Sequence, residues 1–578
     1  MDRGRKKRKT VDLIKLKHEY WANVFTGVID ILRNTEKLND DNIITIKNVA
    51  DKHKSRLLIA RYSKSLDTHG KFPTPILLSG LYERLISLIA NDVITQTKKE
   101  LENAMYFSMS IDSVPDTDES AIYIRYVDDK GIPKKRFLDI INIRGDDCLQ
   151  LINILHVTLD KYNLSHSGFM GLSYNINSNI PKHRASLKSS LKSINKFAEI
   201  VPCSSDPLSL VVIKAVSSCN EGSVFFTTID ELFNFFLFFQ NQWDDVKFLF
   251  KDLSYDKFSS KNKTRQCLNK NWSTIVYALF HISKNISFSY TIRLNAFLVL
   301  QKVKRLETCI ITMFWEEIIG KIKELEKNLQ KYVSTEINFL KIFEIYQSLI
   351  SYLNDFRTNE KFMDYKTCAF EKSNILHFNN SFHTEKPQMR FPVGYVDETD
   401  QFKINTYFYM IDEIQAELQY RKDIYWDLTS KFNFLNNIST ITDAELYLAL
   451  EHLLCIYLEY IDYHISIECD QLKNNSNNIK RTLTSIREVS TFIPSNKIFF
   501  EQLSKVIKMA LCISATNCKV EHSTFSVLEK VITSLKPITS EDTYNSLLII
   551  NMNHELLKNL DFKNVIKDFA GSQSTESL

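Results

Sequence analysis

A chain of 578 residues has room for about three or four domain-sized units, and its 12 glycines and 11 prolines are few, so long helices should dominate. The net charge of +4 is too small to indicate a polyanionic partner by itself. The ten cysteines are scattered without a Cys-x-x-Cys pair, which argues against a zinc finger or a disulfide framework. No stretch supplies the roughly 20 uncharged apolar residues of a membrane helix, so no membrane partner is expected.

The chain opens with a basic segment, residues 1–10, that carries Arg3, Arg5, Lys6, Lys7, Arg8 and Lys9. The apolar run of a signal peptide does not follow it. The segment is typical of a nuclear-import signal or of a phosphate-contacting arm, and the alternative is a solvated end. Residues 11–104 then repeat apolar side chains at helical spacing, which predicts an N-terminal helical region.

Three antiparallel strands are predicted next. Residues 107–113 alternate apolar and small polar side chains, whereas 121–127 and 136–143 are β-branched and aromatic. Asp128-Asp129-Lys130-Gly131 supplies a hairpin turn between the last two strands. Asp112 lies where the first strand ends, which is where an RNase H-like nuclease or transposase has its first metal-binding carboxylate. The alternative is an aspartate that caps the strand.

Helices and strands alternate after these three strands. Residues 168–175 and 199–203 are predicted strands, and the first of them ends at Asn175. The helix between them carries Arg184, Lys188, Lys192 and Lys196 at intervals of four, which places a basic stripe on one face. Such a stripe fits a phosphate backbone, and the alternative is a solvated face. The order of three strands, helix, strand, helix, strand and helix is the RNase H-like order.

Strand signals nearly vanish between residues 227 and 500, where apolar residues recur at helical spacing. We therefore expect a mostly α fold of the α+β class: an RNase H-like mixed sheet core, interrupted by a large all-α insertion and completed by C-terminal helices. The expected segments are a basic tail at 1–10, helices at 11–104, the first part of the core at 105–222, the insertion at 223–498, a C-terminal region that completes the core at 499–570 and a disordered tail at 571–578.

Several motifs resemble those of one family in order and spacing. Ile111 to Asp116 resembles I-x-D-E-T-T-D, Gly171 to Asn175 resembles G-Q-S-Y-D, Cys203 to Leu210 resembles C-x-x-H-x-L-x-L, and Thr264-Arg265-Gln266 resembles T-R-W. Phe525-Ser526-x-Leu528, Leu535-Lys536 and Asp561-Phe562 follow in the order of the hAT dimerisation region. Through these motifs nearly the whole chain resembles the hAT-superfamily transposases, in the branch of the zinc-finger MYM-type proteins and the THAP-domain repressors.

The resemblance implies a site in which three carboxylates, Asp, Asp and Glu, bind two divalent metal ions that drive phosphodiester attack. Asp112 keeps the first position, but Asn175 occupies the second and His522 the third. Glu521 is the candidate for a displaced ligand, about 100° round the helix from His522. Losing two acidic ligands should lower the rate about 10³-fold or more. We therefore expect an inactive enzyme that binds no cofactor. If activity remains, which is the alternative, Asp112 would bind Mg²⁺ or Mn²⁺.

The resemblance also implies a homodimer through the C-terminal region, with apolar contacts from Phe525, Leu528, Leu535, Leu547 and Leu548. DNA would lie against Arg184, Lys188, Lys192, Lys196 and Arg265. The expected function is that of a degenerate, domesticated transposase-like factor in the nucleus that binds DNA or protein, with no small-molecule substrate. The alternatives are an active DDE-type transposase that uses two divalent metals, and an interaction scaffold without DNA affinity.

Overall fold

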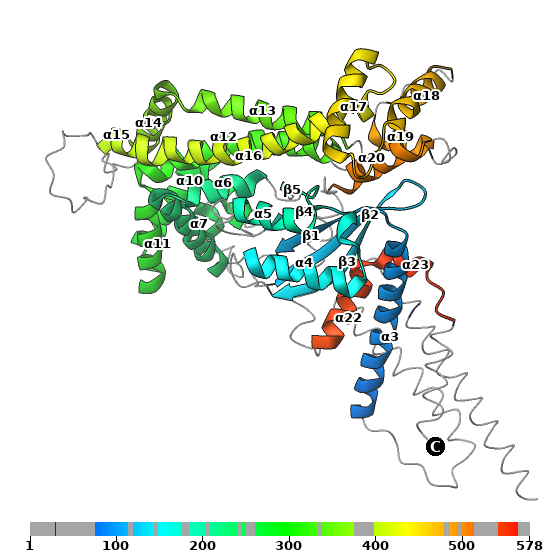
Figure 1. The fold of residues 1–578 in the computed structure, drawn as a ribbon. Helices are drawn as coiled ribbons and strands as arrows, with labels where there is room; N and C mark the ends of the chain where they lie inside the picture. The colour runs from blue at the N-terminus through cyan, green and yellow to red at the C-terminus, as the bar shows by residue number, and fades with distance from the viewer. Residues whose placement is uncertain are drawn as a thin grey trace, which may run out of the picture. The chain divides into compact units, whose positions relative to one another are not determined.

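The computed structural model describes residue 29 and residues 75–113, 119–142, 148–175, 184–202, 208–239, 246–249, 261–332, 337–374, 398–478, 483, 485–493, 500–513 and 541–563. The chain divides into two compact units. The sheet unit is discontinuous in sequence and comprises Met1–Ser205 and Phe434–Leu578. The helical unit is the continuous segment Asp206–Asn433. Figure 1 colours both units by residue number.

The sheet has five strands, β1 (Phe107–Ser113), β2 (Glu119–Val127), β3 (Pro133–Asn142), β4 (Phe169–Asn175) and β5 (Glu199–Pro202). They lie in the order β3-β2-β1-β4-β5; β2 is antiparallel to both β1 and β3, whereas β4 and β5 run parallel to β1. The predicted order of strands and crossover helices is confirmed. The predicted hairpin turn is also present, because Asp128 Oδ1 accepts hydrogen bonds from Lys130 N and Ile132 N, and Gly131 has a φ of 75°.

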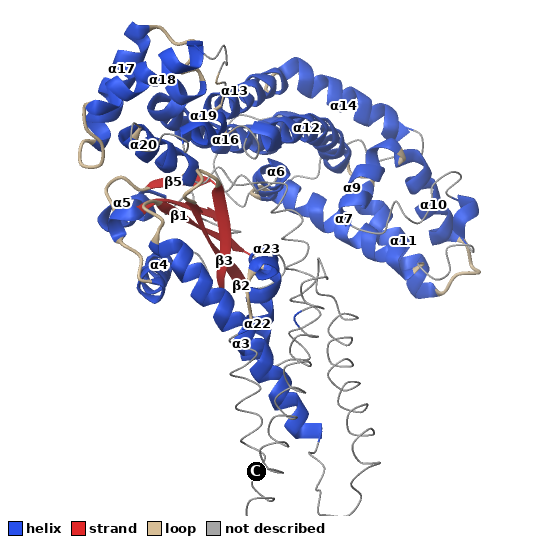
Figure 2. Cartoon of the chain, turned by 90° about the vertical axis from the view of Figure 1, so that its right-hand side faces the viewer, coloured by secondary structure: helices blue, strands red, loops and turns tan. Residues whose placement is uncertain are grey.

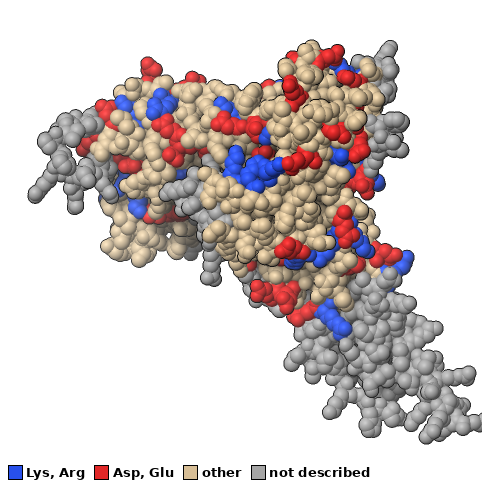
Figure 3. All heavy atoms as spheres, in the orientation of Figure 1, with Lys and Arg blue, Asp and Glu red and all other residues tan. Residues whose placement is uncertain are grey.

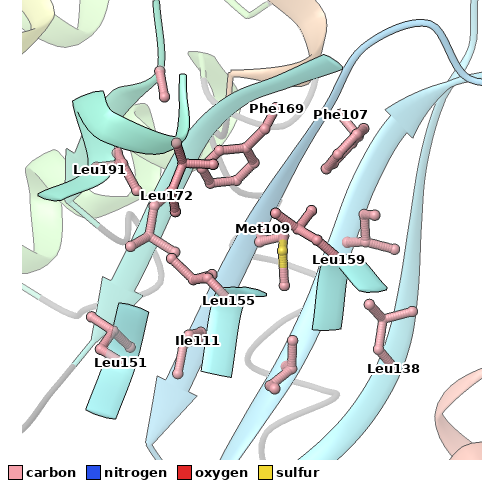
Figure 4. Close-up of a cluster of buried hydrophobic side chains, with 14 of the residues drawn as sticks. Phe107, Met109, Ile111, Leu138, Leu151, Leu155, Leu159, Phe169, Leu172 and Leu191 are labelled. Atoms are coloured by element: carbon pink, nitrogen blue, oxygen red, sulfur yellow. The ribbon is translucent and has the colours of Figure 1, made fainter. Parts of the chain in front are cut away.

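Apolar residues that alternate along the strands build a core on one face of the sheet (Figure 4). Phe107, Met109 and Ile111 of β1 face this core, where they meet the helices α4 (Cys148–Tyr162) and α5 (Arg184–Ile194). α4 contributes Leu151, Leu155 and Leu159 at intervals of four, as an amphipathic helix on a sheet requires. The intervening positions of β1, which include Asp112, therefore lie on the opposite face.

The opposite face is covered by helices from both parts of the sheet unit (Figure 2). α3 (Pro75–Glu102), α22 (Glu541–Met552) and α23 (His554–Asn559) enclose a second apolar cluster with Tyr123 and Phe137 of the sheet. Asn553, between α22 and α23, binds the outer edge of β3 with its side chain: its Oδ1 accepts from Phe137 N at 3.0 Å, and its Nδ2 donates to Phe137 O at 2.9 Å. One amide side chain thus replaces a neighbouring strand at this point.

The C-terminal end of α20 (Glu501–Cys512) docks on the same face of the sheet. The last carbonyl groups of a helix have no hydrogen-bond donor within it. Two side chains of the sheet donate hydrogen bonds to those of α20. Arg125 Nε donates to Leu511 O at 2.8 Å, and Ser108 Oγ donates to Cys512 O. The C-terminal helices therefore complete the core of the sheet unit, as the sequence predicts.

The remaining helices of the sheet unit are α17 (Asp443–Tyr457), α18 (His464–Asn478) and α19 (Ile486–Phe492), with short turns at His166–Gly168 and Asn433–Asn436. Thr442 and Glu445 form a capping box at the start of α17. Glu468 of α18 accepts from the first backbone N–H groups of α20, Gln502 N and Leu503 N. These contacts tie α18 to α20. The second segment of the sheet unit begins at Phe434, whereas we expected the insertion to extend to residue 498.

The helical unit consists of α6 (Leu208–Ser217), α7 (Asn220–Phe238), η3 (Lys247–Leu249), α9 (Lys261–Lys270), α10 (Trp272–Lys284), α11 (Tyr290–Val303), α12 (Leu306–Lys331), α13 (Phe339–Phe356), α14 (Asn359–Asn374), α15 (Glu398–Phe402) and α16 (Tyr409–Phe432), the last preceded by a π-helical turn at Lys403–Phe408. No strand is present in the described part of this unit. α13 and α16 pack along each other, with Tyr346 stacked on Tyr425. Among the described residues, the structure contains no helix long and apolar enough to span a bilayer.

Candidate functional site

Asp112 lies one residue before the end of β1, on the face of the sheet away from α4 and α5. Its side chain is buried, with 1% of its surface exposed. The two alternating neighbours on that face, Ser108 and Ser110, are small and also buried. The carboxylate is therefore shielded from solvent on this face of the sheet and does not lie in an open cleft.

A cation of the protein itself lies beside this carboxylate. Lys135 Nζ, from β3, is 3.9 Å from Asp112 Oδ2 and 4.1 Å from the centre of the Tyr123 ring. The lysine reaches across β2, which separates β3 from β1 in the sheet. An ammonium group at this distance neutralises part of the charge that would otherwise attract a metal ion, and it repels a cation that approaches Asp112.

The strand register brings the second predicted position beside the first. Asp112 and Asn175 are paired across the parallel strands β1 and β4, so their backbones lie next to each other at the same end of the sheet. The structure describes the backbone of Asn175 and not its side chain. An amide stands where the resemblance implies a second carboxylate, and an amide carries no charge to hold a divalent cation.

The third predicted position lies outside the described residues, as do both candidates for it, His522 and Glu521. The proposed dimer contacts Phe525, Leu528 and Leu535 lie outside them as well. Within the described residues, no group of three or more His, Cys, Asp or Glu side chains is arranged to hold a metal ion.

Glu119 is a carboxylate near this end of the sheet that sequence reasoning missed. It begins β2 and is 5% exposed; two positions further along the strand, Ala121 is paired with Asp112. Tyr544 of α22 donates its hydroxyl to Glu119 Oε2 at 3.0 Å, and burial together with this carboxylate raises the pKa of Tyr544. A hollow lined by Glu119, Asn142, Glu541 and Tyr544 opens here. Alternation along β2 places Glu119 on the same face as Ala121 and Tyr123, and this is the signal that could have found it.

The predicted basic stripe is shorter than its spacing indicates. α5 ends at Ile194, so the expectation that Lys196 extends the helix is wrong. Just beyond the helix, the Asn195 side chain donates to Ser167 O and Phe169 O and accepts from Phe197 N. Lys196 pairs with Glu459, and Lys192 Nζ lies 3.6 Å from Glu199 Oε1.

Of the two other residues in the stripe, Lys188 is exposed, and the side chain of Arg184 is outside the described residues. Arg265, on α9, is directed into the helical unit, where its guanidinium lies 5.0 Å from the centre of the Phe226 ring. Burial lowers the pKa of Arg265, and the nearby Asp230 opposes that shift. Among the described basic residues predicted to contact DNA, Lys192 and Lys196 thus lie beside carboxylates, and Arg265 packs against an aromatic ring.

Leu547 and Leu548 of α22 are fully buried in the sheet unit. They belong to the cluster formed by α3, α22, α23 and the sheet. Packing within one chain therefore explains why these two positions, which were predicted to be dimer contacts, are apolar.

The family comparison agrees with this architecture. A model of the ZMYM1/FAM200 RNase-like domain family, DUF4371, matches residues 74–184. These residues form an RNase-like domain. The match spans α3, α4 and the four strands β1 to β4, and so includes both Asp112 and Asn175. No curated protein matches the sequence.

Proposed function

We propose that this chain is a catalytically inactive, hAT transposase-like protein that works as a dimeric nuclear binding factor. The observation that carries the inactive assignment is the environment of Asp112. The carboxylate is buried, the Lys135 ammonium lies 3.9 Å away, and the neighbouring strand presents Asn175 in place of an acid. Two-metal catalysis requires several carboxylates around the ions, and this pair of strands supplies one.

The test is divalent-metal binding by calorimetry, run beside a plasmid-nicking assay. We expect neither Mg²⁺ nor Mn²⁺ to bind in the micromolar range, and we expect nicking by the wild-type chain to equal that of Asp112→Ala. The matched gain-of-function variant is Lys135→Gln with Asn175→Asp, which removes the ammonium and restores the acid; it should bind Mn²⁺ more tightly than the wild type. Micromolar binding by the wild type, with nicking that Asp112→Ala abolishes, would refute the proposal and support an active transposase.

For the binding role, a protein partner has more support than DNA. Lys192 and Lys196 lie beside Glu199 and Glu459, which reduces the net positive charge that α5 and its following turn offer to a phosphate backbone. A labelled DNA duplex should therefore bind weakly, and Lys188→Glu should change its affinity little. Tight binding that falls steeply between 50 and 200 mM salt would favour the DNA-binding alternative.

The nuclear and dimeric parts of the proposal rest on sequence. The basic residues between Arg3 and Lys9 support nuclear import, and a fluorescent fusion in which these six residues are replaced by Gln should lose nuclear accumulation. The hAT-like motif at Phe525 and Leu528 supports the dimer. Sedimentation velocity should show a dimer that Phe525→Asp dissociates, whereas a monomeric wild type would remove dimerisation from the proposal.

A further inference from the structure

Helix α11 carries an apolar surface on the side that does not face its own core. Its buried residues are Ala296, Val299, Leu300 and Val303, at the spacing of one helical face. A second set, Tyr290, Leu294, Phe297 and Leu298, follows the spacing i, i+4, i+7, i+8, and each side chain is between 39% and 70% exposed. A helix that is apolar on both sides is normally covered on both sides, so this surface is suited to a partner.

The charged residues of α10 and α11 are all basic: Lys284, Arg293 and Lys302. Lys302 pairs with Glu231 of α7, so Lys284 and Arg293 supply the charge of this surface. Arg293 lies about 40° round α11 from Phe297, Lys284 ends the neighbouring helix α10, and Lys304 Nζ is 5.9 Å from the centre of the Phe280 ring. We call Tyr290, Leu294, Phe297 and Leu298, with Lys284 and Arg293, the basic face. The surface over α11 in Figure 3 is largely uncharged.

A surface of the opposite sign lies on α17 in the sheet unit, where the charged residues are all acidic: Asp443, Glu445 and Glu451. Asp443 pairs with Lys473 of α18 and Glu445 caps the helix, so Glu451 supplies the negative charge beside the exposed apolar residues. Tyr447, Leu448 and Leu458 are between 58% and 67% exposed, and helical geometry places Glu451 among them on the same side of α17. Tyr463 and Ile467, at the start of α18, are also exposed. We call Tyr447, Leu448 and Leu458, with Glu451, the acidic face.

We propose that the acidic face of one molecule docks on the basic face of a second molecule of this chain. Each face is a group of exposed apolar side chains, and burying such groups drives association. Opposite charge makes the two faces attractive to each other, whereas two basic faces or two acidic faces repel. The contact is therefore heterologous, and it builds rings or open chains in place of a symmetric pair. It is separate from the dimer proposed for the C-terminal region.

The test uses two variants that each damage one face of the full chain. Leu294→Glu with Phe297→Glu places like charges opposite the acidic face, and Tyr447→Lys with Leu448→Lys does the same opposite the basic face. All four side chains are exposed, and far-UV circular dichroism with a thermal melt checks that each variant folds. The matched control is Met363→Glu on α14, which is exposed and belongs to neither face.

Sedimentation velocity over a range of micromolar concentrations measures the assembly at low and high salt. We expect the wild type and Met363→Glu to grow in mass with concentration and less so at high salt, and each face variant to associate at least about 10-fold more weakly. An equimolar mixture of the two face variants should associate again, because each still carries one intact face. The C-terminal dimer should persist in both variants, because neither changes the C-terminal region. A loss of larger assemblies with the dimer retained therefore reports on the two faces alone.

Three results would overturn the docking proposal. One is a wild type whose mass does not change with concentration, and another is a mixture of face variants that stays as small as either variant alone. The third is a labelled 20-nucleotide oligothymidine that binds the wild type and not the Leu294→Glu, Phe297→Glu variant, because this result would assign the basic face to nucleic acid.

Discussion

The contact of Asn553 with the outer edge of β3 leads to a quantitative prediction. Its side chain is 3% exposed, accepts from Phe137 N, and donates both to Phe137 O and to Ile549 O at 3.0 Å. In Asn553→Ala these backbone groups remain buried while their partner is lost. A buried polar group left without a partner costs about 1–3 kcal/mol, so the loss of the partner of both Phe137 groups should lower the free energy of unfolding by about 2–6 kcal/mol.

The measurement is urea unfolding of the full chain, monitored by circular dichroism, together with hydrogen exchange of the peptide that contains Phe137. The control is Asn559→Ala on the adjacent helix, where an exposed amide makes one bond to Glu555 O at 3.2 Å. We expect that control to change stability by less than about 0.5 kcal/mol. Equal stabilities of the two variants, with unchanged exchange at Phe137, would refute the view that this amide substitutes for a strand.

Three further predictions concern other residues. Gly131→Ala should destabilise the protein by about 1–3 kcal/mol, because its φ of 75° disfavours a side chain and the new Cβ would lie 2.6 Å from Ser490 Oγ. Gly320→Ala should instead stabilise by up to about 1 kcal/mol, because this helical position has open space around it; thermal melts of both variants check the opposite signs. Burial raises the pKa of the Cys512 thiol from 9.0 to about 12, so at pH 8 a maleimide should label the exposed Cys368 and leave Cys512 protected, as mass spectrometry of the labelled peptides will show. The same shift stabilises the fold fully below pH 9 and progressively less as the pH rises from 9 to 12, which alkaline unfolding measures.

Local sequence pattern predicts the strands and several of their neighbours correctly. Alternation along residues 107–113 separates the core-facing Met109 from Asp112, and the spacing of α4 places Leu155 on the sheet. The pairing of Asp112 with Asn175 also follows from the order of strands, because parallel neighbours end at the same edge of a sheet. These features depend on residues close together in sequence or on the handedness of crossover connections.

Features made by residues far apart in sequence could not be predicted in this way. Lys135 approaches Asp112 because it lies two strands away in space, which no periodicity records. Asn553 and Phe137 are more than 400 positions apart, and their pairing depends on where α22 ends. The partners of Lys196 were missed for the same reason, since Glu459 belongs to the distant second part of the sheet unit. Basic spacing on a helix predicts a stripe, but it cannot show which charges tertiary contacts neutralise.

The division of the sheet unit into two distant segments affects how the chain is made. On the ribosome, β5 is complete roughly 340 residues before the first residue of α22 is synthesised. At about 5–20 residues per second, the face around Tyr123 and Phe137 waits roughly 17–70 s for α22 and α23. The continuous segment from Asp206 to Asn433 can fold during this interval. Newly made sheet is therefore exposed to other nascent chains, and we expect production of this protein to be sensitive to chaperone supply and to translation speed.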